Sequence, residues 1–336
     1  SASGTLNSTQ TASISFTTSE ATSNFASGDA SANLATLGAI TGSGTNYSAN
    51  LTATADGVWS ASVAAGVFTD AAGNPNVASA PITGTADVTA PRAVRVSALD
   101  ALYKSGDVVE ITVEFNEAVT VDVARTITLD LSPTRTATYL SGNGTNKVVF
   151  RYTVVSGDQT VDLNYAATGN WTGSGNVTDL AGNVASSFAL PASTSTTASL
   201  AGTSTVKIDA LAPTAANAPT LTITGGSAAN MINLASTNLT IGATWATADA
   251  TLSQVEFLIA GSVVATQTIA NPASATSATF NLGTATAAAI QAAVPTGGAV
   301  TIRLVDIAGN SATSTATVLV TDYVAPTVTI DRKSVV

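Results

Sequence analysis

Apolar and polar residues alternate over several short stretches of the chain, as expected for strands with one buried face. In residues 109–115 the four odd positions are Val, Ile, Val and Phe, while the even positions carry Glu, Thr and Glu. An antiparallel sheet can bury one face and leave the other in water, so this pattern predicts antiparallel strands. Similar patterns occupy residues 11–17, 58–63, 127–131, 148–154, 161–165, 221–223, 239–241, 255–259 and 300–305.

Turn-forming residues separate these stretches. Ala260-Gly261-Ser262 predicts a tight hairpin between residues 255–259 and 263–265. One segment departs from the pattern, because residues 286–293 are helix formers followed by Pro295, and they predict one short helical turn. Many short strands with regular turns predict an all-β fold of β-sandwiches, and the absence of long helical periodicity argues against an α/β enzyme fold.

A motif of the form D-x-A-G-N occurs at residues 70–74, 179–183 and 306–310, and each copy is followed by a D-x-x-A-P motif. The aspartates that open the second motif are Asp87, Asp209 and Asp322, spaced 122 (87 to 209) and 113 (209 to 322) residues apart. Such spacing is domain-sized. It predicts three tandem domains, here named repeat one (residues 1–88), repeat two (89–210) and repeat three (211–324).

The two ends of the sequence lead to separate expectations. A strand-like run follows Ser1 closely, so we expect repeat one to be truncated at its start and the chain to be a piece of a longer protein. Residues 325–336 either start a further repeat or form an artefactual tail. The last six residues, Asp331 to Val336, fit the preceding pattern poorly, which favours the artefact for that hexapeptide.

Composition narrows the function classes. Charged residues make up 10% of the chain, the net charge is −10, and there is no His and no Cys. Without a basic patch, nucleic acid is not an expected partner. Without His or Cys, the usual general bases and thiol nucleophiles are missing, so we expect no enzyme. A cysteine-free, Thr-rich acidic chain is typical of bacterial surface proteins, and no apolar run has transmembrane length.

Several motifs together resemble a known family. These are Asn116-Glu117-Ala118-Val119, the D-L-A-G-N motif at 179–183, the D-x-x-A-P linkers and the segment 103–107 before the Glu117 strand. The combination resembles the bacterial Ig-like, cadherin-like repeats of large surface adhesins and surface-layer proteins. Repeat one shares the pattern through Ser19-Glu20-Ala21, whereas repeat three lacks that motif. The resemblance implies tandem Ig-like β-sandwich domains with short linkers, located outside the cell.

Strand direction in a seven-stranded sandwich places three carboxylates at one pole of repeat two. Asp179 precedes the last strand, Glu117 ends the second strand, and the linker that begins at Asp87 arrives at the same pole. Clustered carboxylates repel one another unless a cation neutralises them, and Ca²⁺ prefers six to eight oxygen ligands. We therefore expect calcium at the junction of repeats one and two, with Asp179 facing backward to the preceding linker.

The same reasoning extends to other acidic residues. Asp209 and Asp306, with Asp249 as a weaker third ligand, predict a second calcium site. Glu20 and Asp70 predict half a site, and Asp322 the outgoing half of another. In the alternative interpretation, each Asp of D-x-A-G-N only caps its own turn and each linker Asp only begins an extended segment. Trp59, Trp171 and Trp245 are expected to pack in the cores, with sugar stacking as the alternative.

The leading functional hypothesis is a modular stalk that holds a distal binding region away from a bacterial cell or builds a surface layer. Its partners would be neighbouring repeats of the same chain. The second hypothesis is a module that binds a surface glycan or protein through exposed loops. The third is an accessory region of a secreted enzyme.

Overall fold

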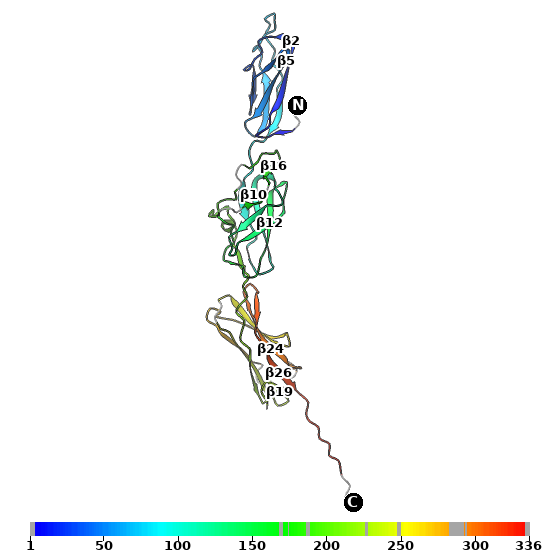
Figure 1. The fold of residues 1–336 in the computed structure, drawn as a ribbon, viewed down its shortest axis with the longest axis vertical. Helices are drawn as coiled ribbons and strands as arrows, with labels where there is room; N and C mark the ends of the chain where they lie inside the picture. Colours follow the sequence, from blue (N-terminus) through cyan, green and yellow to red (C-terminus); the bar gives the residue numbers. More distant parts are fainter. Residues whose placement is uncertain are drawn as a thin grey trace. The chain divides into compact units, whose positions relative to one another are not determined.

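The regular secondary structure of the computed structural model is almost entirely β-strand, which confirms the predicted all-β fold of Ig-like sandwiches (Figure 1). The structure describes residues 4–167, 171–173, 175–185, 189–225, 228–246, 250–281, 292 and 294–332. The chain forms two compact units. The first comprises residues 1–100, 108–152 and 162–206, and the second comprises residues 101–107, 153–161 and 207–336.

Repeat one contains two sheets. One has the strand order β1-β7-β6-β3 and the other the order β2-β5-β4, and β1 lies parallel to β7. Trp59 of β6 is 2% exposed and packs with Ile14 and Leu51 from the opposite sheet. The strands are β1 (Thr5–Leu6), β2 (Ala12–Thr22), β3 (Ala30–Asn33), β4 (Ala35–Leu37), β5 (Thr41–Ala53), β6 (Gly57–Val63) and β7 (Ile82–Ala86).

Repeat two is built around β10, whose inward residues follow the predicted alternation and are fully buried from Val109 to Phe115. Its larger sheet has the order β15-β11-β12-β13-β10-β16, with β8 also pairing β10, and a smaller sheet has the order β14-β17-β9. The elements are β8 (Ala93–Ser97), β9 (Ala101–Tyr103), β10 (Val108–Thr120), β11 (Thr126–Leu129), β12 (Arg135–Ser141), β13 (Thr145–Thr153), β14 (Gln159–Thr160), β15 (Trp171–Thr172), β16 (Thr178–Asp179), α1 (Leu200–Thr203) and β17 (Val206–Asp209).

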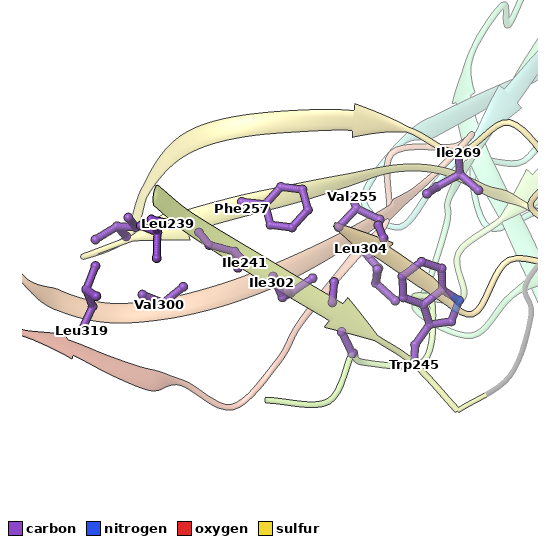
Figure 2. Packing of buried hydrophobic residues seen from close by; sticks show 14 of the residues in the cluster. Leu239, Ile241, Trp245, Val255, Phe257, Ile269, Val300, Ile302, Leu304 and Leu319 are labelled. Atoms are coloured by element: carbon purple, nitrogen blue, oxygen red, sulfur yellow. The ribbon is translucent and has the colours of Figure 1, made fainter. Parts of the chain in front are cut away.

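Repeat three has one sheet of order β18-β20-β23 and another of order β19-β26-β24-β21-β22, with β25 pairing β24. Figure 2 shows side chains from both sheets meeting between them, including Ile241 from one sheet and Phe257 and Ile302 from the other. The strands are β18 (Thr220–Thr224), β19 (Met231–Asn233), β20 (Asn238–Thr244), β21 (Leu252–Ile259), β22 (Ser262–Thr268), β23 (Ser277–Asn281), β24 (Gly298–Asp306), β25 (Ser311–Thr313) and β26 (Thr317–Asp322).

Local predictions had mixed outcomes. The hairpin at 260–262 is confirmed, with Ala260 and Gly261 at positive φ between β21 and β22. The strand predicted over 161–165 is wrong, because β14 ends at Thr160 and Val161 is 86% exposed. The helix α1 was not predicted. The expected helical turn at 286–293 lies outside the described residues except for Ala292.

Every strand pair in the described part of the chain joins two strands of the same repeat. The boundaries at residues 88, 210 and 324 remain predictions. Within these same residues, no helix has the length and apolarity needed to cross a lipid bilayer.

Candidate metal centre

Three carboxylates meet where the linker after β7 reaches repeat two. Asp87, Glu117 and Asp179 each place one carboxylate oxygen within 4.8 Å of the others. The ladder between β10 and β16 pairs Val119 with Asp179 and so brings Asp179 beside Glu117. The amide of Asp87 donates to the carbonyl of Leu6 at 2.9 Å, which fixes the linker. The structure therefore brings together the three residues predicted to converge, and Asp179 faces backward as expected.

Asp179 also caps its own turn. Its Oδ1 accepts hydrogen bonds from the amides of Gly182 at 2.6 Å and Asn183 at 2.8 Å, and its Oδ2 accepts one from Asn183 Nδ2 at 2.6 Å. Gly182 has φ +93°, a conformation that favours glycine. The capping interpretation is thus confirmed for this turn. Capping does not exclude a cation, because a carboxylate has about four lone-pair positions and three are used.

Asn183 connects three segments of the chain. Its Nδ2 donates to the backbone carbonyl of Asp87 at 2.7 Å, and its Oδ1 accepts from the amide of Ser8 at 2.8 Å. Asn7 of the same loop donates to the carbonyl of Ala181 at 3.0 Å. Asn183 is 2% exposed, and both its Nδ2 and its Oδ1 are hydrogen-bonded. Its side-chain oxygen thus binds repeat one.

The surroundings of the cluster disfavour the negative charges of Asp87 and Glu117. Burial raises the pKa of Asp87, and the charges of Asp179 and Asp56 raise it further. Burial also raises the pKa of Glu117, a hydrogen bond from Asn116 opposes this, and the charges of Asp87, Asp179 and Asp56 add to the increase. Each shift means that the negative form is destabilised by its surroundings. A bound cation would remove that repulsion.

Asp56 is a contributor that sequence reasoning missed. Its carboxylate accepts hydrogen bonds from the Val88 amide at 2.6 Å and the Thr89 hydroxyl at 2.6 Å, so it holds the linker just after Asp87. The Thr89 hydroxyl is the main cause of its lowered pKa. Asp56 precedes Gly57 and was interpreted only as part of a turn. No repeated motif marks it, so the sequence carries no signal of its role.

The D-x-A-G-N turn at residues 306–310 has a similar internal geometry to the turn at 179–183. Asp306 accepts hydrogen bonds from the amide and the Nδ2 of Asn310, both at 2.8 Å, and Asn310 Nδ2 also donates to the carbonyl of Asp209 at 2.7 Å. Asp249 lies outside the described residues. Within the described chain, no third carboxylate forms a tight group with Asp209 and Asp306.

The two turns differ in the side chain that covers their glycine. A Cβ added to Gly182 would lie 3.1 Å from Asn7 Nδ2, whereas a Cβ added to Gly309 would lie 3.2 Å from Lys104 Nζ. The turn at 179–183 therefore faces a neutral amide, and the turn at 306–310 faces an ammonium group. This positive charge from Lys104 reduces the need of the turn at 306–310 for a bound cation.

The remaining predicted ligands are less closely grouped. Asp70 caps the turn at 70–74 by accepting hydrogen bonds from Asn74. Among the described residues, neither side chain is hydrogen-bonded to a linker that precedes repeat one. Glu20 and Asp70 line the same cleft of repeat one. Asp322 Oδ1 accepts a hydrogen bond from the Val324 amide at 3.1 Å, as expected for the start of an extended linker.

The three tryptophans are buried, which confirms the core interpretation. Trp59, Trp171 and Trp245 are 2%, 9% and 3% exposed. Trp245 Nε1 donates to the carbonyl of Ala275 at 2.8 Å. None of the three presents an open ring face to a sugar.

Comparison with known proteins gives one family match. Residues 1–85 match the model of the bacterial Ig-like domain. No curated protein sequence matches the chain. No catalytic family is indicated.

Solved structures with similar chains include three multidomain proteins. The fibronectin(III)-like modules of Clostridium thermocellum CbhA are 15% identical, with 68% of this chain and 93% of that chain covered and a TM-score of 0.26. The Escherichia coli adhesin FdeC is 13% identical, with 96% and 95% covered and a TM-score of 0.36. The ectodomain of mouse nectin-like molecule 4 is 12% identical, with 97% and 99% covered and a TM-score of 0.21.

Proposed function

We propose that the chain is a non-catalytic section of a modular bacterial surface protein, because residues 1–85 match the model of the bacterial Ig-like domain. It spaces a distal binding region from the cell, or builds a surface layer, and it works outside the cell. Ca²⁺ bound by Asp87, Glu117 and Asp179 stiffens the junction of repeats one and two.

The convergence of these three carboxylates carries the proposal. They come from the linker, from β10 and from the end of β16, so one ion would bridge segments far apart in the sequence. Oxygen ligands from carboxylates are the donor set that Ca²⁺ prefers, and backbone carbonyls and water would complete its shell. The residues present therefore fit the ion.

The expected stiffening of the junction follows from the thermodynamic linkage between ion binding and order. An ion that binds only the ordered junction stabilises that state by an amount that grows with free calcium concentration. The hydrogen bonds of Asn183 already hold the linker to the turn. Calcium would add charge neutralisation, because the raised pKa values of Asp87 and Glu117 show that their charges are costly without it. The junction would thus be ordered in calcium and looser without it.

We propose a weaker role for calcium at Asp209 and Asp306. Lys104 lies against Gly309 of that turn and supplies a positive charge from within the chain. The calcium response is therefore expected to come mainly from the first junction.

Glu117→Gln and Asp87→Asn test the proposal without disturbing the turn, because neither side chain caps it. Calcium titration followed by calorimetry should show one dominant site in the parent chain, and calcium should raise the melting temperature and slow amide exchange in residues 88–90. Each variant should lose at least ten-fold in calcium affinity. Glu110→Gln is the matched control, since Glu110 is an exposed residue of the same strand.

Two outcomes would contradict this role for calcium. One is a parent chain whose melting temperature and linker exchange do not change when a chelator is added. The other is an undiminished calcium response in both Glu117→Gln and Asp87→Asn.

A further inference from the structure

The turn between β12 and β13 carries a residue pair that occurs once in the sequence. Asn143 is the only asparagine of the chain that is followed by a glycine, Gly144. Because glycine has no Cβ, its backbone nitrogen can approach the side-chain amide of the preceding residue with little hindrance. Both residues are exposed, so water reaches the turn. The turn thus combines the residue pair and the solvent access that hydrolysis of an asparagine amide requires.

Hydrogen bonds hold the two reacting groups of this turn to β10 and to the residue after it. The amide of Gly144 donates to the carbonyl of Val119 at 2.8 Å. The Oδ1 of Asn143 accepts from the amide of Val121, also at 2.8 Å, and both valines are buried. The hydroxyl of Tyr139 adds a third bond, since it accepts from the amide of Asn143 at 3.1 Å. While the turn is closed, the nucleophile and the electrophile of an internal attack are therefore each bound elsewhere.

The turn is a small exposed part of repeat two, and its opening does not require the sandwich to unfold. Residues 142–144 lie between β12 and β13. Gly144 has φ +79°, and a Cβ added to it would meet nothing within 4 Å, so little packing holds this end of the turn. Exposed turns with few packed neighbours open locally at a cost far below that of global unfolding. The closed turn therefore protects the Asn143 amide, and brief openings release it.

From this arrangement we infer that Asn143 is a deamidation site whose rate is set by opening of the turn at 142–144. When the turn opens, the Gly144 nitrogen gives its proton to solvent base and bonds to Cγ of Asn143. The Cγ–Nδ2 bond breaks, and the leaving group takes up a proton and departs as ammonia. Water then opens the cyclic imide at either of its two carbonyls. One product is aspartate, and the other is isoaspartate, in which the main chain runs through Cγ. Water is the only co-reactant.

The two products affect β10 differently. Aspartate keeps an oxygen that can accept from the Val121 amide, so the turn is retained with one added negative charge. Isoaspartate inserts one carbon atom into the main chain just before Gly144, which displaces the Gly144 amide from the carbonyl of Val119. Val119 is the ladder partner of Asp179. The isoaspartyl product therefore loosens the end of β10 that pairs with Asp179.

Mass-spectrometric peptide mapping of the full chain after long incubation in mildly alkaline buffer tests the inference. We expect Asn143 to be converted to the acid faster than any other asparagine of the folded chain. The conversion should be about ten-fold slower than in the same chain unfolded in urea, because the closed turn protects the amide. A methyltransferase specific for isoaspartate should label the same peptide. Asn143→Gln should abolish the fast conversion, because the longer side chain cyclises more slowly.

Tyr139→Phe tests whether opening of the turn sets the rate. It removes the hydroxyl that accepts from the Asn143 amide and keeps the ring, so deamidation should become about three-fold faster. Tyr47→Phe is the matched control, because it removes a tyrosine hydroxyl bonded to the carbonyl of Thr22 in repeat one and should leave the Asn143 rate unchanged.

Three results would overturn the inference. The first is an equal rate at Asn143 in the folded and the unfolded chain, and the second is an equal rate in Tyr139→Phe and the parent. The third is a folded chain in which Asn143 is converted no faster than an exposed asparagine without a following glycine, such as Asn46.

Discussion

The side-chain amide of Asn183 donates a hydrogen bond of 2.7 Å to the backbone carbonyl of Asp87, 96 residues earlier in the chain. Asn310 makes the equivalent bond to Asp209, also at 2.7 Å. Both asparagines also bind the aspartate that opens their own turn. In repeats two and three, the asparagine of the D-x-A-G-N turn therefore anchors the preceding linker by a hydrogen bond.

Replacing Asn183 should destabilise the junction strongly. Asn183→Ala removes hydrogen bonds to Asp87, Asp179 and Ser8 at a buried position, and we expect a cost of about 3 kcal/mol in the unfolding of repeat two. Chemical denaturation followed by tryptophan fluorescence measures the change. Asn74→Ala is the control, since Asn74 occupies the same turn position but is exposed and should cost less than about 1 kcal/mol. Equal losses of unfolding free energy in the two variants would contradict the role of Asn183 in anchoring the linker.

Acidification should stabilise the calcium-free junction. The pKa values of Asp87 and Glu117 are raised in the folded chain, so the folded state holds these protons more tightly than the unfolded state. Stability from these groups therefore increases as pH falls from 7 through the raised pKa values toward the ordinary carboxyl range near about pH 4. Asp56, with a lowered pKa, loses its contribution at still lower pH.

Melting curves in chelator between pH 7 and 4.5 measure this effect. The gain in melting temperature should shrink in Glu117→Gln, because one of the two titrating groups is gone. Saturating calcium should reverse the trend, since protons compete with the ion for the same oxygens. A calcium-free melting temperature that falls steadily from pH 7 to pH 5 would contradict the prediction.

Comparing alanine substitutions at Gly182 and Gly73 distinguishes the cost of backbone strain from the cost of side-chain packing at the junction. Both have positive φ, +93° and +89°, so alanine costs each about 1–2 kcal/mol in backbone conformation. Only at Gly182 would the new methyl group approach Asn7 Nδ2, at 3.1 Å, whereas nothing lies within 4 Å at Gly73. We expect Gly182→Ala to lower the melting temperature more than Gly73→Ala and to speed amide exchange at residues 7–9. Identical losses would show that the Asn7 contact is not significant.

The core of repeat one should not tolerate a side chain at Gly84. A Cβ there would lie 2.3 Å from Cζ2 of Trp59, which is buried between the sheets. Gly84→Ala is expected to destabilise repeat one by about 1–3 kcal/mol through overpacking. Gly38→Ala, whose nearest neighbour would be 3.4 Å away, should be nearly neutral by the same calorimetric measurement. A neutral Gly84→Ala would show that Trp59 can shift without cost.

The sequence pattern predicts a strand correctly where the backbone is regular and fails where it is bent. The alternation over 109–115 predicts β10 well, because every inward side chain there is buried. The same alternation at 161–165 is misleading. Leu163 and Tyr165 are buried through irregular backbone, and Tyr165 Oη bonds the carbonyl of Pro191 at 2.6 Å. A period of two thus reports burial on alternate residues, which a bent segment also achieves.

The site was predictable where strand direction alone decided the outcome. Glu117 and Asp179 lie on adjacent strands, so their meeting with Asp87 follows from topology. Asp56 and the bonds of Asn183 were not predictable, because their partners are backbone groups of the linker and leave no pattern of side chains in the sequence. Whether calcium occupies the cluster stays a prediction.

The distance in sequence between Asp87 and Asn183 also sets an order of events during synthesis. The linker is made first, but the group that grips it is made 96 residues later, when repeat two is nearly complete. A similar distance, 101 residues, separates Asp209 from Asn310. The bonds of the first linker to Leu6 and Asp56 lie within repeat one, whereas its bond to Asn183 can form only after residue 183 has been made. Since domains fold as units during synthesis, this linker makes its last contact when repeat two folds.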